Sequence, residues 1–90
     1  MVNELKEKCL YKVNTVFLGD KESSFEVIYI KKIIKKSNTF VMLAKTVKFL
    51  YPVSKGDEDL LSDWNTTVKN EDLKYFEYMG TEEDYPEYFI

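Results

Sequence analysis

Apolar and polar residues alternate near the start of the chain. Over residues 10–18 (LYKVNTVFL), every second side chain falls on the same side of an extended segment. The residues on the apolar side are Tyr11, Val13, Thr15 and Phe17. This period of two predicts a half-buried strand over residues 10–18, and Gly19 to Ser24 then provide a turn.

Two longer apolar runs follow, residues 25–36 (FEVIYIKKIIKK) and 40–53 (FVMLAKTVKFLYPV). Ser37, Asn38 and Thr39 lie between them, so the two runs predict a β-hairpin. Each run is long for one flat strand. We therefore expect a bulge or bend near Lys31–Lys32 and another near Ala44–Lys45.

Residues 27–36 also fit a helix. At about 100° per residue, Val27, Ile30, Ile33 and Ile34 share one side, opposite four lysines. Such a basic amphipathic helix suits a membrane surface or an acidic partner. The many β-branched residues from 27 to 34 and the lack of a C-cap favour the strand.

The rest of the chain predicts short elements. Residues 57–64 suggest a short helix or ordered loop, 66–69 a brief strand, 70–73 a single turn and 74–79 a closing strand that Gly80 ends. Residues 81–84 resemble a capping box before Pro86. With no repeats and no long linker, residues 1–90 form one domain. Residues 10–54 supply its hairpin core, and residues 55–90 complete the sheet.

The expected fold class is mainly β, all-β leaning towards α+β: a small bent antiparallel sheet or an SH3-like barrel with short helical segments. The long central hairpin around Ser37–Asn38 and the single turn at residues 70–76 (NEDLKYF) resemble SH3-like small barrels. The resemblance is architectural and covers residues 10–79. It implies an interaction module, because such barrels share no common ligand.

The residue types that are absent limit the chemistry. The chain has no His, no Arg and no Gln, and Cys9 is its only cysteine. Histidine-based nucleophile systems and tetrahedral zinc sites therefore cannot be built. Asp57, Asp59 and Asp63 suggest a calcium loop, but the sixth position is Ser62 instead of Gly and the twelfth is Val68 instead of Glu. We expect no catalytic residue, no metal and no cofactor, and hence a protein that is not an enzyme.

Localisation follows from the same residues. A single cysteine fits a reducing compartment. No apolar run is long enough to span a bilayer, and the chain starts without a leader pattern. We expect a cytoplasmic protein, in a bacterial host cell if a phage encodes it.

Charge divides the chain into two parts. Residues 1–55 hold eleven lysines and five acids, a net charge of +6, whereas residues 56–90 hold two lysines and eleven acids, a net charge of −9. The acidic part is also rich in aromatic residues. Solubility and core filling account for such a composition in ordinary domains, but carboxylates beside exposed Tyr and Trp also suit binding to a basic protein surface.

The first functional hypothesis is a non-enzymatic protein-binding module that docks through this acidic aromatic surface. In size and charge, this chain resembles small acidic proteins of phages or mobile elements that inhibit host nucleic-acid-handling or defence proteins. The candidate residues are Asp57, Glu58, Asp59, Asp63, Trp64, Glu77, Tyr78, Glu82, Glu83, Asp84 and Tyr85. The expected partner is a basic-surfaced protein, and no membrane is expected to take part.

The alternative is a small-barrel protein that binds single-stranded nucleic acid through the hairpin. Its candidate residues are Lys31, Lys32, Lys35, Lys36, Lys45 and Lys48, with Tyr29 or Phe40 as stacking surfaces. Lysines that protect a sheet edge from aggregation would give the same pattern. A homodimer through the sheet edge or the apolar tail Tyr88–Phe89–Ile90 is a third possibility.

Overall fold

The part of the chain that the structure describes contains five strands in one antiparallel sheet. The structure is a computed structural model that describes residues 4–19, 21, 23–50 and 63–89. The strands are β1 (Cys9–Asn14), β2 (Phe25–Lys35), β3 (Thr39–Phe49), β4 (Asp63–Lys69) and β5 (Phe76–Thr81), and their order in the sheet is β4-β3-β2-β1-β5. The mainly β fold class is therefore confirmed.

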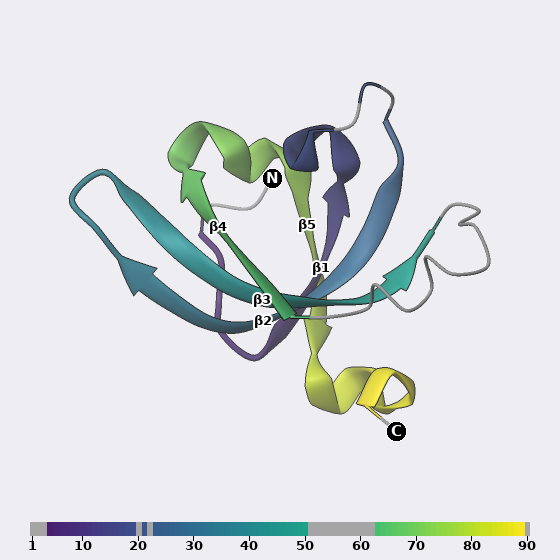
Figure 1. The fold of residues 1–90 in the computed structure, drawn as a ribbon. Helices are drawn as coiled ribbons and strands as arrows, with labels where there is room; N and C mark the ends of the chain where they lie inside the picture. Colours follow the sequence, from purple (N-terminus) through teal and green to yellow (C-terminus); the bar gives the residue numbers. More distant parts are fainter. Residues whose placement is uncertain (1–3, 20, 22, 51–62, 90) are drawn as a thin grey trace.

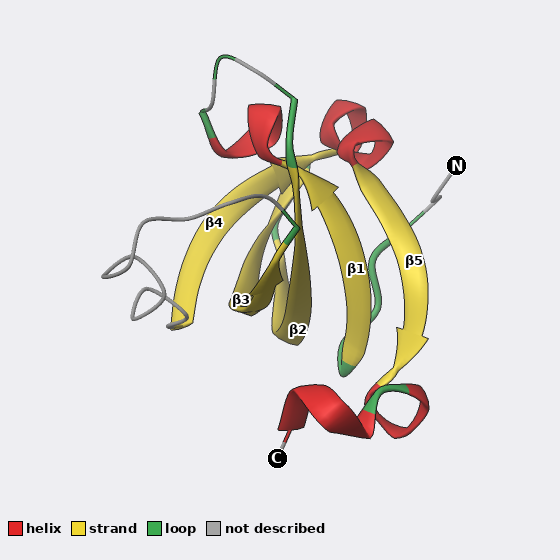
Figure 2. Ribbon diagram, turned by 90° about the vertical axis from the view of Figure 1, so that its right-hand side faces the viewer, coloured by secondary structure: helices red, strands yellow, loops and turns green. Residues whose placement is uncertain are grey.

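Four short 3₁₀ helices lie at the two ends of the curved sheet in this part of the chain. They are η1 (Thr15–Leu18), η3 (Asn70–Tyr75), η4 (Glu82–Asp84) and η5 (Pro86–Phe89). Figure 2 shows η1 and η3 at one end of the sheet and η4 and η5 at the other. No helix among the described residues has the length and apolar character needed to cross a membrane.

The predicted hairpin is present, and the helical alternative for residues 27–36 is wrong. β2 and β3 pair along their length, and their tip extends well beyond β1 and β5 (Figure 1). One bulge leaves Lys31 without an opposite residue, as expected. The second bulge is at Val47 and not at Ala44–Lys45, because the pairing shifts between Thr46 and Lys48. Residues 51–53, the end of the predicted second run, lie outside the described residues.

The sheet is bent but does not close into a barrel. β4 and β5 are its two edges, and in the described structure they pair with β3 and β1 and not with each other. The small bent sheet is therefore the correct alternative. The long hairpin and the single turn before the last strand, on which the SH3-like resemblance rests, are both present (Figure 1).

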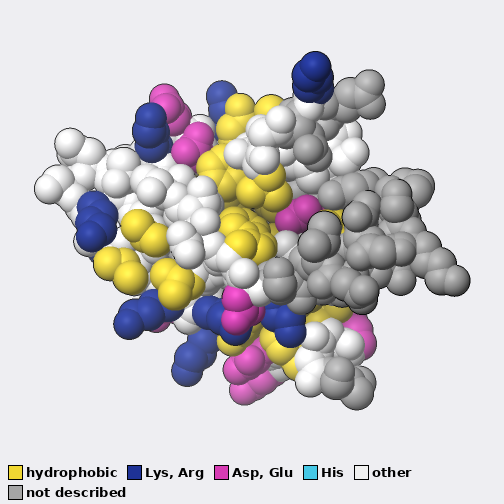
Figure 3. All heavy atoms as spheres, viewed as in Figure 1, with side chains coloured by type: hydrophobic (Ala, Val, Ile, Leu, Met, Phe, Trp, Pro, Cys, Tyr) yellow, Lys and Arg dark blue, Asp and Glu magenta, His cyan; other side chains and the backbone are white. Residues whose placement is uncertain are grey.

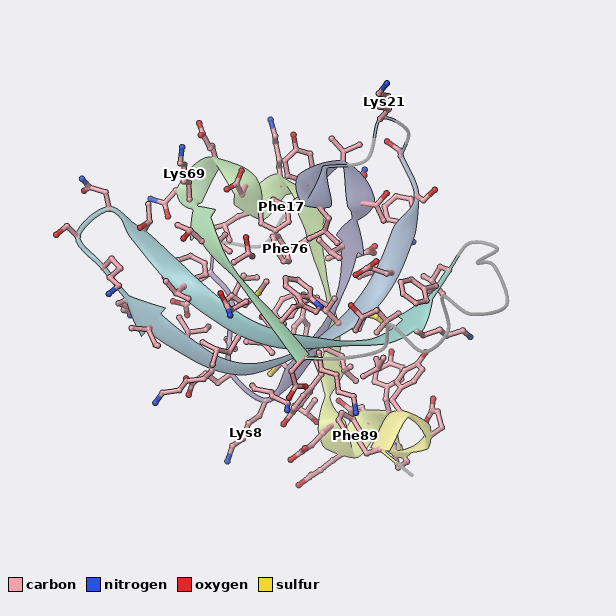
Figure 4. All side chains as sticks on the ribbon, in the orientation of Figure 1. Lys8, Phe17, Lys21, Lys69, Phe76 and Phe89 are labelled. Atoms are coloured by element: carbon pink, nitrogen blue, oxygen red, sulfur yellow. The ribbon has the colours of Figure 1, made fainter. Side chains whose placement is uncertain are left out.

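The first strand is shorter than the alternation predicted. Asn14 ends β1, because its Oδ1 accepts a hydrogen bond from the backbone N–H of Val16 (3.0 Å) and starts η1. Thr15 then exchanges hydrogen bonds with Ser24 across the turn. Phe17 still reaches the core, with its ring centroid 5.2 Å from that of Phe76 (Figure 4).

The C-terminal elements are displaced from their predicted bounds. β4 starts at Asp63 instead of Thr66, η3 extends to Tyr75, and β5 runs to Thr81. Gly80 therefore does not end the last strand but pairs with Leu10 inside it. The predicted helix or loop at 57–64 falls outside the described residues up to Ser62, and its last two residues belong to β4.

The main core lies on the concave face of the sheet. Its buried members are Leu5, Cys9, Tyr11, Val13, Ile28, Ile30, Met42, Ala44, Val68, Leu73 and Phe76. At its start β1 is buried on both faces, since Leu10, which points away from Tyr11, has no exposed surface, whereas Lys12 and Asn14 further along are partly exposed. The opposite, convex face of the sheet is thus also covered near Leu10. In the strand pairing, Leu10 lies opposite Tyr29 of β2 and Gly80 of β5.

A series of side-chain hydrogen bonds connects three strands on the core side of the sheet. The Trp64 indole N–H donates to Thr46 Oγ1 (2.8 Å), and the Thr46 hydroxyl donates to Glu26 Oε1 (2.9 Å). Thr46 and Glu26 are both buried. A buried polar group without a hydrogen bond is costly, so the Thr46 hydroxyl holds β2, β3 and β4 in one register.

Replacing Thr46 tests this chain of hydrogen bonds. Thr46→Val keeps the shape but removes the hydroxyl, so we expect the free energy of unfolding to fall by about 1–3 kcal/mol. Thr46→Ser keeps the hydroxyl and serves as the matched control with a smaller loss. Denaturant titration measures both. A valine variant as stable as the serine variant would contradict the assigned role.

Candidate functional site

The structure places the predicted acidic residues at opposite edges of the sheet. Asp63 and Trp64 lie on β4, whereas Glu77 and Tyr78 lie on β5. Asp57, Glu58 and Asp59 fall outside the described residues. The remaining candidates, Glu82, Glu83, Asp84 and Tyr85, follow β5 at one end of the sheet. The described candidates therefore do not form one continuous surface.

Two of the predicted carboxylates are neutralised by lysines. The Lys31 ammonium is 2.7 Å from Asp63 Oδ2, and the Lys12 ammonium is 3.9 Å from Glu77 Oε2. Lys31 is the bulged residue of β2, and Lys12 lies opposite Glu77 in the ladder. These pairs reduce the negative potential that each edge strand presents to a partner.

The aromatic candidates on the edge strands differ in exposure. Trp64 is half-buried, packs against the core and donates its indole N–H to Thr46, so it is not the exposed contact residue that was expected. Tyr78 is 49% exposed, with its ring 5.5 Å from that of Tyr11. Of these two, only Tyr78 offers substantial aromatic surface.

The helices η4 and η5, here called the C-terminal turns, form the acidic end of the molecule. The backbone N–H of Thr81 donates to Asp84 Oδ2 (3.0 Å), which confirms the predicted capping box at residues 81–84. Pro86 then begins η5, where its missing N–H costs no hydrogen bond. Short local interactions thus set the conformation of this segment.

The C-terminal turns pack closely against the backbone of β5 at Gly80. A Cβ atom at Gly80 would lie 2.8 Å from Asp84 Oδ2 and 3.1 Å from Tyr85 Cε2. The Tyr85 hydroxyl donates to the carbonyl of Met79 (3.4 Å), and the Tyr85 ring stacks on Tyr88 at 5.9 Å. The absence of a side chain at Gly80 therefore allows the chain to fold back.

Tyr29 of β2 makes the long-range contacts of the C-terminal turns. Its hydroxyl donates to Glu82 Oε2 (3.0 Å), and its ring centroid is 4.8 Å from that of Phe89. Burial is the largest cause that raises the pKa of the Tyr29 phenol, and the hydrogen bond to Glu82 and the negative charge of Glu82 raise it further. Figure 4 shows Phe89 at the end opposite the Phe17–Phe76 contact.

The C-terminal turns concentrate negative charge on an ordered support. Their acidic residues, Glu82, Glu83, Asp84 and Glu87, are all exposed. Among the described residues, no lysine ammonium lies within 4.0 Å of these carboxylates. In Figure 3 the lysines follow the lower border of the hairpin and meet Asp and Glu side chains where the C-terminal turns begin.

The lysines of the alternative hypothesis gather on the hairpin. Lys31, Lys32, Lys35, Lys36, Lys45 and Lys48 are all exposed on β2, β3 and the turn between them. Within the described structure, only Lys31 of this set has a carboxylate within ion-pair distance. The expected stacking residues are less accessible, because Tyr29 contacts Phe89 and Phe40 packs against the core.

Neither metal binding nor a family relationship supplies further clues to function. The described residues contain no group of three or more Cys, Asp or Glu side chains that could hold a metal ion. Comparisons of the chain with protein-family models, with curated proteins and with solved structures find no match. The function must therefore be argued from the geometry.

Sequence reasoning missed three residues that support the acidic end: Tyr29, Gly80 and Phe89. Tyr29 lies 53 residues before Glu82, and no local pattern links them. Gly80 followed by a capping box is a local signal for a change of direction, although the close approach of Tyr85 depends on tertiary packing. These three residues set where the carboxylates lie.

Glu82→Gln tests the contact between the C-terminal turns and the sheet. The amide oxygen can still accept from Tyr29, but the negative charge is lost, so the pKa of Tyr29 should fall towards its ordinary value of 10.0. Titration of the tyrosine ring signals by NMR measures this shift. Glu83→Gln, the adjacent control, should leave the Tyr29 pKa unchanged, and an equal effect of both changes would contradict the contact.

Proposed function

We propose that this protein is a non-enzymatic protein-binding module that docks through its C-terminal turns on a basic protein surface. One observation carries the proposal: four exposed carboxylates, at Glu82, Glu83, Asp84 and Glu87, stand on a segment held against the sheet. An ordered segment loses less conformational entropy on binding than a loose acidic tail. The proposed surface is smaller than the one expected from sequence.

The neighbouring aromatic side chains support a protein partner. Phe89 is 42% exposed, and Tyr85 and Tyr88 form a stacked pair within the C-terminal turns. Aromatic residues contribute strongly to protein interfaces, while carboxylates speed association with a cationic surface and determine its orientation. A partner that suits both features has a basic groove with apolar contacts inside it.

The partner class follows from this chemistry. Basic grooves are typical of proteins that handle nucleic acids, because such proteins must neutralise phosphates. Carboxylates on a small rigid support can occupy such a groove in place of phosphates. We therefore propose that the protein is an inhibitor, of the kind that phages and mobile elements encode, of a host nucleic-acid-handling or defence protein.

Charge reversal of the C-terminal turns tests this function. We expect Glu83→Lys/Glu87→Lys to lose capture of the interacting protein from a bacterial lysate, and to bind the purified interactor at least about tenfold more weakly. Neither carboxylate has a structural contact within the described residues, so the fold should persist. Quantitative mass spectrometry and biolayer interferometry give the two readouts.

The matched control is Glu4→Lys/Glu71→Lys, which changes the net charge equally at exposed positions outside the C-terminal turns. This control should capture the interactor like the unmodified protein. If both double variants lost capture equally, net charge alone would explain the result. If neither lost it, the docking surface would lie elsewhere.

A second candidate function is binding of single-stranded nucleic acid by the hairpin. The observation that favours it is the set of six exposed lysines, of which only Lys31 is ion-paired within the described structure. The nearby carboxylates of the C-terminal turns would repel a nucleic-acid backbone. For this reason it ranks behind protein binding.

Oligonucleotide titration distinguishes the second candidate from the first. A true nucleic-acid interface should bind a labelled single strand with an affinity that falls between about 50 and 200 mM salt. Lys32→Gln/Lys45→Gln should reduce the slope of log affinity against log salt by about 1.4, as expected for two lost phosphate contacts on a single strand. Fluorescence anisotropy that shows no salt-dependent binding would exclude this function.

A further inference from the structure

The tip of the β2–β3 hairpin forms a polar pocket that the proposed protein-binding function does not use and that contains Lys35 and Lys36 of the second candidate function. The backbone N–H of Lys36 donates to the carbonyl of Thr39 (2.8 Å), which closes a tight turn around Ser37 and Asn38. β4 pairs its last residue, Lys69, with Thr39, so the following residue, Asn70, lies beside the turn. Between them lies an open pocket of about 310 Å³.

The lining of this pocket combines positive charge with neutral polar groups. It consists of Lys35, Lys36, Ser37, Asn38, Thr39 and Asn70. These side chains offer two ammonium groups, two hydroxyls and two amides, and no carboxylate belongs to the lining. A cation would be repelled by the two ammonium groups, whereas an oxyanion could accept hydrogen bonds from every lining side chain.

We propose that this pocket binds a phosphate group. Lysine holds phosphate as a mobile point charge, and hydroxyl and amide donors can bond the remaining oxygens of a tetrahedral anion. The pocket volume is at the lower end of the range for ligand sites, so it admits one phosphate with part of the molecule that carries it. The phosphate belongs either to a free phosphate compound or to a nucleic-acid chain.

The charges around the pocket are consistent with an anion. Lys69 is exposed next to Asn70 and adds a third positive charge. Two acidic residues near the pocket belong to η3. Asp72 accepts a hydrogen bond from the backbone N–H of Lys69 (3.0 Å), and Glu71 is exposed in the same turn. Glu7 lies beside β2, where its Oε2 accepts a hydrogen bond from the backbone N–H of Ile33 (2.7 Å). None of these three carboxylates lines the pocket.

Lysines continue from the pocket along β2. Lys32 is exposed and has the same side-chain parity as Lys36 of the pocket, four residues and about 13 Å away at the rise of an extended strand. A nucleic-acid chain anchored at the tip could therefore contact further ammonium groups, whereas a free phosphate would occupy the tip alone. This difference separates the two sources of phosphate experimentally.

The test is an NMR titration of the isotope-labelled full chain with inorganic phosphate at constant ionic strength. Saturable shifts should appear at the amide and side-chain signals of Ser37, Asn38, Thr39 and Asn70. Lys35→Gln/Lys36→Gln should weaken the affinity at least about tenfold, since both lysines line the pocket.

The matched control is Lys8→Gln/Lys21→Gln, which removes the same charge at exposed positions away from the tip (Figure 4). This control should keep its phosphate affinity within about twofold. Circular dichroism melts of both variants check that the fold is intact. Equal losses in both variants would show non-specific attraction and overturn the proposal.

Further titrations identify the source of the phosphate. A nucleoside monophosphate that binds as tightly as a short single-stranded oligonucleotide indicates a free phosphate compound. An oligonucleotide that binds far more tightly, with added shifts at Lys32, indicates a nucleic-acid chain. Absence of saturable shifts at the tip with all three probes overturns the site. None of these outcomes depends on partner capture by the C-terminal turns, so the two proposals can fail separately.

Discussion

The close approach at Gly80 determines where the acidic end of this protein lies. A Cβ atom there would be 2.8 Å from Asp84 Oδ2 and 3.1 Å from Tyr85 Cε2, so any other residue would force these side chains to shift. Folding back at this point brings Glu82 and Phe89 to Tyr29, on a strand two positions away in the sheet. The negative charge is thus presented by a supported segment, and the proposed function depends on that support.

Ion pairs with lysines explain why the proposed acidic docking surface is confined to the C-terminal turns. Asp63 and Glu77 each lie within reach of a lysine, so the two edge strands contribute less negative potential than their sequence suggests. The hairpin, by contrast, presents mainly lysines to solvent. The described part of the chain therefore presents a negative and a positive region, and we propose a basic protein as the partner of the first and a phosphate group as the ligand of the second.

Sequence patterns predicted the strands, turns and caps well where interactions between residues close in sequence determine them. The β-branched run at 25–36, the turn at Ser37–Asn38 and the capping box at Thr81 all appear in the structure, and so does the bulge at Lys31. The early end of β1 was missed, because the Asn14 side chain binds the backbone of Val16 although the alternation of apolar residues continues to Phe17.

The candidate site was less predictable, because it depends on register. The Lys31–Asp63 pair joins residues 32 positions apart across two strand pairings and a bulge. The half-burial of Trp64 similarly depends on Thr46 lying within reach on β3. Composition shows that residues 56–90 are rich in carboxylates, but only tertiary packing decides which of these pair with lysines and which stand together.

Backbone order parameters from ¹⁵N relaxation test the central claim most directly. If the C-terminal turns are held against the sheet, residues 82–89 should have order parameters near about 0.85, like those of β1 and β5. Values below about 0.6 for these residues would mean that the segment moves independently of the sheet. The carboxylates would then belong to a flexible tail, contrary to the proposed docking surface.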